Sequence, residues 1–109
     1  MIEINTQREL DQLVNHSDAV LLYFYSDACA PCKSLRPKVQ ELMEEEFGKM
    51  KLVMVNAERN PALAGTHQAF GLPVLLLFFE GKEFLRYSKY VSLAELRESV
   101  GRIYTLYYS

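Results

Sequence analysis

Residues 20–32 read VLLYFYSDACAPC, an apolar run followed by a short break and two cysteines. The run Val20–Tyr25 does not alternate between apolar and polar residues, which is typical of a central strand covered on both faces by helices. Pro31 suits the first turn of a helix, where its missing N–H would have no partner in any case. The stretch therefore predicts a buried strand that leads directly into a helix beginning at the cysteines.

Apolar spacing and capping signals predict the other helices. The helix after the cysteines keeps its apolar spacing from Pro31 to Phe47, and Pro37 inside it should cause a kink. The further helices are expected to run from Thr6 to about His16, from Asn60 toward Gly71, and from Ser92 onward. The side chains expected to be buried on the last helix are Leu96, Val100, Ile103 and Tyr107.

Three more segments have the composition of strands. Lys51–Asn56 and Val74–Phe79 indicate buried strands, and the alternation in Lys82–Ser88 is typical of an antiparallel edge strand. With a first strand placed ahead of the helix that opens at Thr6, the order of elements is strand, helix, strand, helix, strand, helix, strand, strand, helix. With right-handed crossovers this order predicts an α/β fold, a mixed central sheet with helices on both faces, in a single domain of residues 1–109.

Composition disfavours two functional classes. The 109 residues include 12 basic and 14 acidic side chains, so no basic surface for a nucleic acid is expected. The longest apolar run, Leu72–Phe79, is far shorter than the roughly 20 residues that span a bilayer. Met1 leads straight into Ile2-Glu3-Ile4 without the pattern of a secretion signal. A cytoplasmic protein is expected, and in that reducing compartment two cysteines are more often catalytic or metal-binding than structural.

Cys29-Ala30-Pro31-Cys32 carries the chemical signal. Two cysteines three residues apart can close a disulfide across one helical turn, and the first sulfur is expected to be the accessible one. Free N–H groups and the helix dipole would stabilise a Cys29 thiolate and lower its pKa below the usual value of about 8.5. The alternatives are half a zinc site or two core thiols. Because only His16 and His67 could complete a zinc site, at unrelated positions, no metal is expected.

The spacing of three blocks resembles the thioredoxin family over essentially the whole chain. The blocks are the strand Val20–Tyr25, the Cys29–Lys33 start of the helix that contains Pro37, and Gly71-Leu72-Pro73. The resemblance implies the thioredoxin fold and a cis peptide bond before Pro73, beside the sulfurs. It also implies that Ala30, Pro31 and Pro73 support the active site, and that the client contacts Ala28, Gly71 and Leu72.

The activity implied is that of a thiol–disulfide oxidoreductase that reduces protein disulfides. Cys29 would attack the client disulfide and Cys32 would resolve the mixed disulfide, with no cofactor besides the redox-active disulfide. The implied partners are protein disulfide clients and an electron donor such as a thioredoxin reductase, and the chain is expected to be a monomer. The alternative is a thioredoxin-fold adaptor, or redox-regulated binding module, without significant turnover.

Several positions depart from the family pattern. Ala28 and Ala30 stand where thioredoxins usually have Trp and Gly, which predicts a less aromatic client surface. The family's buried Asp, which helps deprotonate the second cysteine, falls on Tyr23, and its nearby Lys falls on Met54. Release of product is therefore expected to be slow.

The remaining candidate residues are given structural interpretations. His67 is expected to be exposed and not a base, and Glu44–Glu46 to form a solvated helix face. Tyr23 and Tyr25 are interpreted as strand core. The aromatic side chains at the end of the last helix are expected to pack, with a dimer or partner surface as the alternative; they are Tyr104, Tyr107 and Tyr108.

Overall fold

Five strands form one mixed sheet in the computed structural model, which describes residues 1–109. The elements in chain order are β1 (Ile2–Glu3), α1 (Gln7–His16), β2 (Ala19–Tyr25), α2 (Ala30–Glu46), β3 (Lys51–Asn56), α3 (Pro61–Thr66), β4 (Val74–Phe79), β5 (Lys82–Ser88) and α4 (Leu93–Tyr107). The strand order is β1-β3-β2-β4-β5, in which β2 is parallel to β3 and antiparallel to β4. This arrangement confirms the predicted element order and the edge position of β5.

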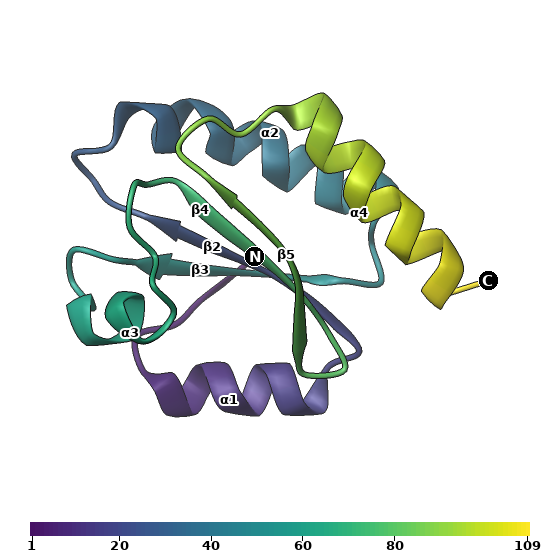
Figure 1. The fold of residues 1–109 in the computed structure, drawn as a ribbon, viewed down its shortest axis with the longest axis horizontal. Helices are drawn as coiled ribbons and strands as arrows, with labels where there is room; N and C mark the ends of the chain where they lie inside the picture. The colour runs from purple at the N-terminus through teal and green to yellow at the C-terminus, as the bar shows by residue number, and fades with distance from the viewer.

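Strand β2 is buried on both faces, as its unbroken apolar sequence predicts. Leu21 and Tyr23 belong to a core shared with α2 and α4, whereas Leu22 and Phe24 belong to a second core shared with α1 and α3. Successive side chains of a strand point to opposite faces, so every residue of β2 meets a layer of helix. Figure 1 shows the two layers, with α2 and α4 on one side of the sheet and α1 and α3 on the other.

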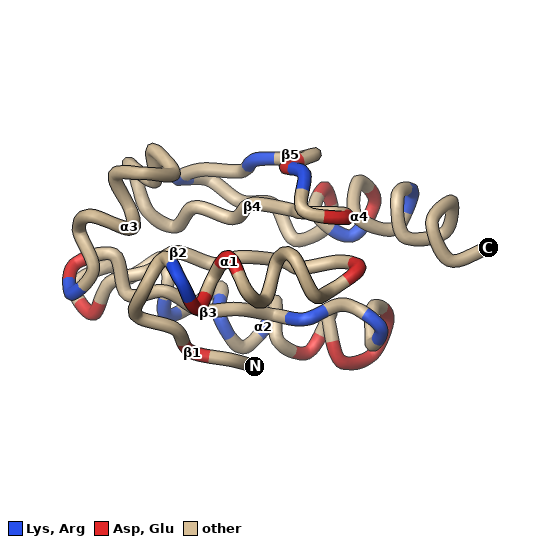
Figure 2. The backbone as a smooth tube through the Cα atoms, turned by 90° about the horizontal axis from the view of Figure 1, so that it is seen from below, with Lys and Arg blue, Asp and Glu red and all other residues tan.

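Charged residues are excluded from the centre of the sheet. Strand β4 has none, whereas α2 and α4 carry residues of both signs (Figure 2). Glu44–Glu46 are exposed, as expected, and Glu46 pairs with Arg97 of α4 at 2.9 Å. Charges therefore mark the helix surfaces and the edge strands, and the central strands β2 and β4 are left to apolar packing.

Helix α2 begins where the sequence predicts, whereas helix α3 is shorter than predicted. Helix α2 begins at Ala30 with Cys29 as its N-cap, and it continues through Pro37. Helix α3 ends at Thr66, so the prediction that it extends toward Gly71 was wrong. It ends early because Gln68 adopts a left-handed backbone, with φ 53°, and because the Ala69 N–H returns to the Ala64 carbonyl at 2.8 Å.

The stripe on α4 is only partly buried. Leu96 and Val100 are buried, whereas Ile103 and Tyr107 are partly buried against the same core, so the prediction is confirmed only in part for those two residues. The last turns of α4 extend past the sheet toward the C-terminus (Figure 1). There they are packed mainly by aromatic rings, as in the pairs Phe47–Tyr104 and Phe79–Tyr107.

His67 is not the exposed side chain that the sequence predicts. Its ring lies against Phe24, with centroids 6.0 Å apart, and against Phe78 at 6.4 Å. Its Nε2 atom is 3.2 Å from Oε1 of Gln7, and its carbonyl accepts a hydrogen bond from Arg86 at 2.9 Å. Burial lowers the pKa of His67, so the folded protein favours the neutral imidazole.

The burial of His67 predicts a specific loss of stability in acid. Because its folded pKa lies below the unfolded value of about 6.5, the unfolded chain binds the proton more readily, and stability falls as pH drops below about 6.5. His67→Gln should make this fall smaller between about pH 7 and pH 5.5. Urea unfolding at a series of pH values measures it, with exposed His16→Gln as the control. Equal pH dependence in all three proteins would contradict the prediction.

Candidate active site

Cys29 and Cys32 form a disulfide at the start of α2, with their Cα atoms 5.3 Å apart. Cys29 is the N-cap residue, and its Sγ accepts a hydrogen bond from the Cys32 N–H at 3.2 Å. Cys32 is 1% exposed, whereas Cys29 is half-exposed. A reagent in solution therefore reaches the first sulfur and not the second, as the position of the pair in the helix predicts.

The site is positioned by the end of the central strand. After β2 the chain turns at Ser26, whose carbonyl accepts the Cys29 N–H at 3.2 Å, and α2 begins at once. Ala28, Ala30 and Pro31 are exposed around the disulfide. The Cys32 N–H that bonds the Cys29 sulfur, together with the positive end of the helix dipole, favours a negative charge on that sulfur.

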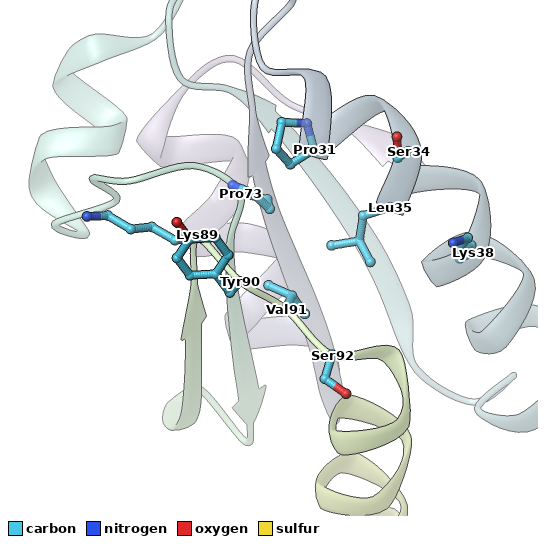
Figure 3. A pocket seen from close by; sticks show the side chains of 9 residues that line it. All are labelled: Pro31, Ser34, Leu35, Lys38, Pro73, Lys89, Tyr90, Val91 and Ser92. Carbon is cyan, nitrogen blue, oxygen red and sulfur yellow. The ribbon is translucent and has the colours of Figure 1, made fainter.

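The loop before β4 supplies the second part of the site. The Leu72–Pro73 bond is cis, which confirms what the family resemblance implies. Pro73 lines the same groove as Pro31, so the loop and the start of α2 meet there (Figure 3). The backbone N–H and carbonyl of Leu72 make no hydrogen bond within the chain, which leaves both able to pair with an extended segment.

Tyr23 lies directly beneath the cysteines. Its side chain is fully buried, and its hydroxyl donates a hydrogen bond to the Cys32 carbonyl at 2.9 Å. Burial raises the pKa of Tyr23 to about 12, and the charge of Arg36 opposes this only in part. Tyr23 pairs in register with Met54, which is also fully buried. The two departures from the family pattern therefore face each other, and neither side chain provides a base at neutral pH.

Tyr25 packs against the core shared with α2 and α4 but is only partly buried, so its interpretation as strand core is confirmed only in part. It is half-exposed at the end of β2, where its hydroxyl donates a hydrogen bond to Oε2 of Glu3, with the two oxygens 2.7 Å apart. The Arg36 guanidinium lies 4.9 Å from the centre of its ring. Burial, followed by the bond to Glu3, raises the pKa of Tyr25. The ring of the last strand residue is thus covered by Arg36 of α2, and its hydroxyl reaches Glu3, which the apolar run alone did not show.

Two exposed aromatic residues near the site were missed by the sequence analysis. Tyr90 is 95% exposed and lines the groove beside Pro73, and Phe70 is 69% exposed just before Gly71. The groove that Pro31 lines therefore contains one aromatic ring, that of Tyr90, although position 28 is Ala. Both lie outside helices and strands, and aromatic residues in loops are the signal that could have identified them.

A family model described as Thioredoxin matches residues 1–102. The chain belongs to the thioredoxin family. It is 38% identical to a thioredoxin of Buchnera aphidicola over 85 residues, which cover 78% of each chain. It is 34% identical to Thioredoxin 1 of Chlorobaculum tepidum over 92 residues, or 84% of this chain and 91% of the relative. The structure of Fasciola hepatica thioredoxin superposes with a TM-score of 0.84 at 26% identity, covering 94% of this chain and 98% of that one.

Thioredoxin-family membership and the Cys29–Cys32 pair identify this chain as a thiol–disulfide oxidoreductase. No group of three or more His, Cys, Asp or Glu side chains is placed to share a metal ion. None of the helices combines the length and the apolar composition needed to cross a bilayer.

The hydroxyl of Tyr23 should contribute to stability through its bond to the start of α2. Tyr23→Phe removes the donor to the Cys32 carbonyl and should cost about 1 kcal/mol in the free energy of unfolding. Urea unfolding of the oxidised protein measures this loss. Tyr90→Phe, at an exposed position without such a bond, should change stability by less than about 0.5 kcal/mol. Equal effects of the two substitutions would show that the Tyr23 bond adds nothing.

Proposed function

We propose that this chain reduces disulfide bonds in client proteins through the Cys29/Cys32 dithiol, with residues 1–109 acting as one domain. The observation that carries the proposal is the difference between the two sulfurs. Cys29 is half-exposed at the N-cap of α2, and Cys32 is 1% exposed behind it. One sulfur is placed to meet a client, and the other is placed to react only with the first.

The proposed reaction begins with the reduced dithiol. The Cys29 thiolate, stabilised by the Cys32 N–H and the helix N-terminus, attacks one sulfur of the client disulfide. That disulfide breaks, the second client sulfur leaves as a thiolate, and a mixed disulfide joins Cys29 to the client. Cys32 then loses its proton and attacks Cys29, releasing the other client sulfur. Two electrons pass to the client, and the internal disulfide remains.

The cycle requires a reductant for the internal disulfide. We propose a disulfide reductase such as a thioredoxin reductase for this role, in a reducing cytoplasmic compartment, with no separate cofactor on this chain. The client would lie as an extended segment against Leu72, whose backbone N–H and carbonyl have no partner within the chain. Ala28 and Gly71 would flank that segment, and Ala30, Pro31 and Pro73 would shape the site around the sulfurs.

The second step has no evident internal base. Tyr23, the titratable side chain bonded to the Cys32 peptide, keeps its proton because burial raises its pKa to about 12. We propose that water or the departing client thiolate accepts the Cys32 proton. The same observation favours the alternative function, an adaptor that forms mixed disulfides but turns over too slowly to be a catalyst. Turnover of a protein disulfide with dithiothreitol as reductant distinguishes the two functions.

The two cysteines should respond differently to substitution. Cys29→Ser should reduce disulfide reduction to background, because Cys32 is too buried to attack a client. Cys32→Ser should accumulate mixed disulfides, detectable by mass spectrometry of the intact complex under non-reducing conditions. Alkylation of the reduced protein should show Cys29 reacting at pH values well below about 8.5. Equal reactivity of both thiols, with no mixed disulfide in either variant, would exclude the proposed division of roles.

A carboxylate at position 23 should accelerate the second step. Tyr23→Asp alone would bury an unpaired charge and destabilise the fold, whereas adding Met54→Lys on the paired strand should recover part of that loss. The double variant should resolve a preformed mixed disulfide at least about tenfold faster near pH 7, and the difference should close as pH rises. Stopped-flow kinetics would measure the rate at which the mixed disulfide is resolved. Met54→Lys alone is the control. Equal rates for parent and double variant at every pH would show that Tyr23 does not limit this step.

A further inference from the structure

A groove of about 470 Å³ opens beside the proposed site of sulfur exchange. One wall is the exposed side of α2 near Ser34 and Lys38, and the other is the Lys89–Ser92 segment between β5 and α4. Pro31 and Pro73 lie together where the walls meet (Figure 3). A segment bound to the Leu72 backbone would therefore continue into this groove.

The two lysines lie on opposite sides of the groove. Figure 3 shows Lys38 on the helix and Lys89 across from it, its side chain extending past Pro73 and away from the centre of the groove. Apolar side chains lie between them, including Leu35, Val91 and the ring of Tyr90. The surface thus has an apolar centre and a positive charge at each side.

Lys89 is held in place by its own backbone. Its N–H donates to the carbonyls of both Gly71 and Pro73 at 3.0 Å, and its φ of 61° is left-handed. Its stem covers Gly71, because a Cβ built on that glycine would lie 2.5 Å from Cε and 2.9 Å from Cγ of Lys89. Gly71 also has a positive φ of 73°, a backbone conformation that favours glycine. The ammonium group is thereby tied to the loop that carries the cis proline.

Positive charge at this end of the molecule is not balanced by the chain itself. The first half of α2 carries Lys33, Arg36 and Lys38, and its acidic residues lie in the second half, from Glu41 onward. None of these three, nor Lys89, forms an ion pair. Asp27, two residues before Cys29, pairs with Arg59, and Glu3 accepts a hydrogen bond from Tyr25. Of these cations Lys38 and Lys89 line the groove, and neither forms an ion pair, in a protein whose net charge is −2.

We propose that this groove selects clients whose disulfide cysteine lies in an extended segment with acidic residues on both sides. The proposal rests on the proposed function and names its substrate class. The apolar centre would cover the residues next to the client cysteine, and carboxylates farther along the segment would meet Lys38 and Lys89. Exposed ion pairs add little affinity individually, so the expected effect is a preference among clients and a faster encounter with acidic ones.

The test uses matched peptides that differ only in the charge around one disulfide cysteine. Glutamate, glutamine or lysine is placed on both sides of that cysteine. The kcat/KM for reduction of each peptide is divided by the kcat/KM of the same protein for hydroxyethyl disulfide. This reference substrate is neutral and too small to reach both lysines. The normalised values should fall in the order glutamate, glutamine, lysine, with a total range of about tenfold. The range should shrink when the salt concentration rises from about 0.05 M to about 0.5 M.

Charge reversal in the groove should invert this order. Lys38→Glu/Lys89→Glu should favour the lysine peptide, and Lys38→Gln/Lys89→Gln, which keeps long polar side chains, should show no preference. Lys51→Glu/Lys82→Glu makes the same change in net charge at the opposite end of the sheet, where Lys51 pairs with Val20 and Lys82 with Phe79. This control should keep the original order.

The outcomes separate failure of the proposal from failure of the proposed function. If the protein does not reduce hydroxyethyl disulfide, the proposed function is wrong. Fluorescence anisotropy with peptides whose cysteine is replaced by serine still tests the groove, since the same order of affinity is expected. Equal values for all peptides, or the original order in the charge-reversed variant, would overturn the proposal. A dimer that Lys38→Glu/Lys89→Glu dissociates, without any peptide preference, would also overturn it and assign the groove to a second copy.

Discussion

The burial of β2 on both faces is the constraint on which the rest of this structure depends. Residues 19–24 are buried, and the strand pairs with β3 on one side and β4 on the other. Such a strand cannot shift in register without moving apolar side chains out of both cores. The end of β2 therefore has a fixed position in the fold, and Cys29 is only four residues beyond it in the chain. The position of the reactive sulfur is a consequence of core packing.

The same strand connects the core to the chemistry through Tyr23. Its ring packs among the side chains shared with α2 and α4, and its hydroxyl reaches the Cys32 carbonyl. A phenol satisfies this buried position at low cost because it is neutral and hydrogen-bonded, whereas a carboxylate there would need a cationic partner. Met54 occupies the adjacent position, so the two residues are mutually compatible. The Tyr23–Met54 pair therefore favours the stability of the core beneath the cysteines. The proton of the Cys32 thiol is left to be removed by solvent or by the client.

The surface around the cysteines is assembled from segments distant in sequence. Lys89 comes from the end of β5, yet its N–H bonds the carbonyls on both sides of Leu72. This contact places the exposed ring of Tyr90 in the groove that Pro31 also lines, with the Lys89 side chain extending away from the centre of the groove. Because these groups are held by backbone bonds and by packing on Gly71, the groove is built before any partner binds.

The sequence alone determined most of the element boundaries and the place of the cysteines, because these depend on local patterns. The unbroken run Val20–Tyr25 identified the central strand, and Pro31 with its neighbours identified the helix start at Cys29. The cis bond before Pro73 came from family resemblance, since no local pattern predicts it. Tertiary structure alone decided that His67 is half-buried against Phe24 and Phe78, that Tyr25 binds Glu3, and that Lys89 and Tyr90 stand beside Pro73. Each of these depends on contacts between residues far apart in the chain, which periodicity and capping rules do not contain.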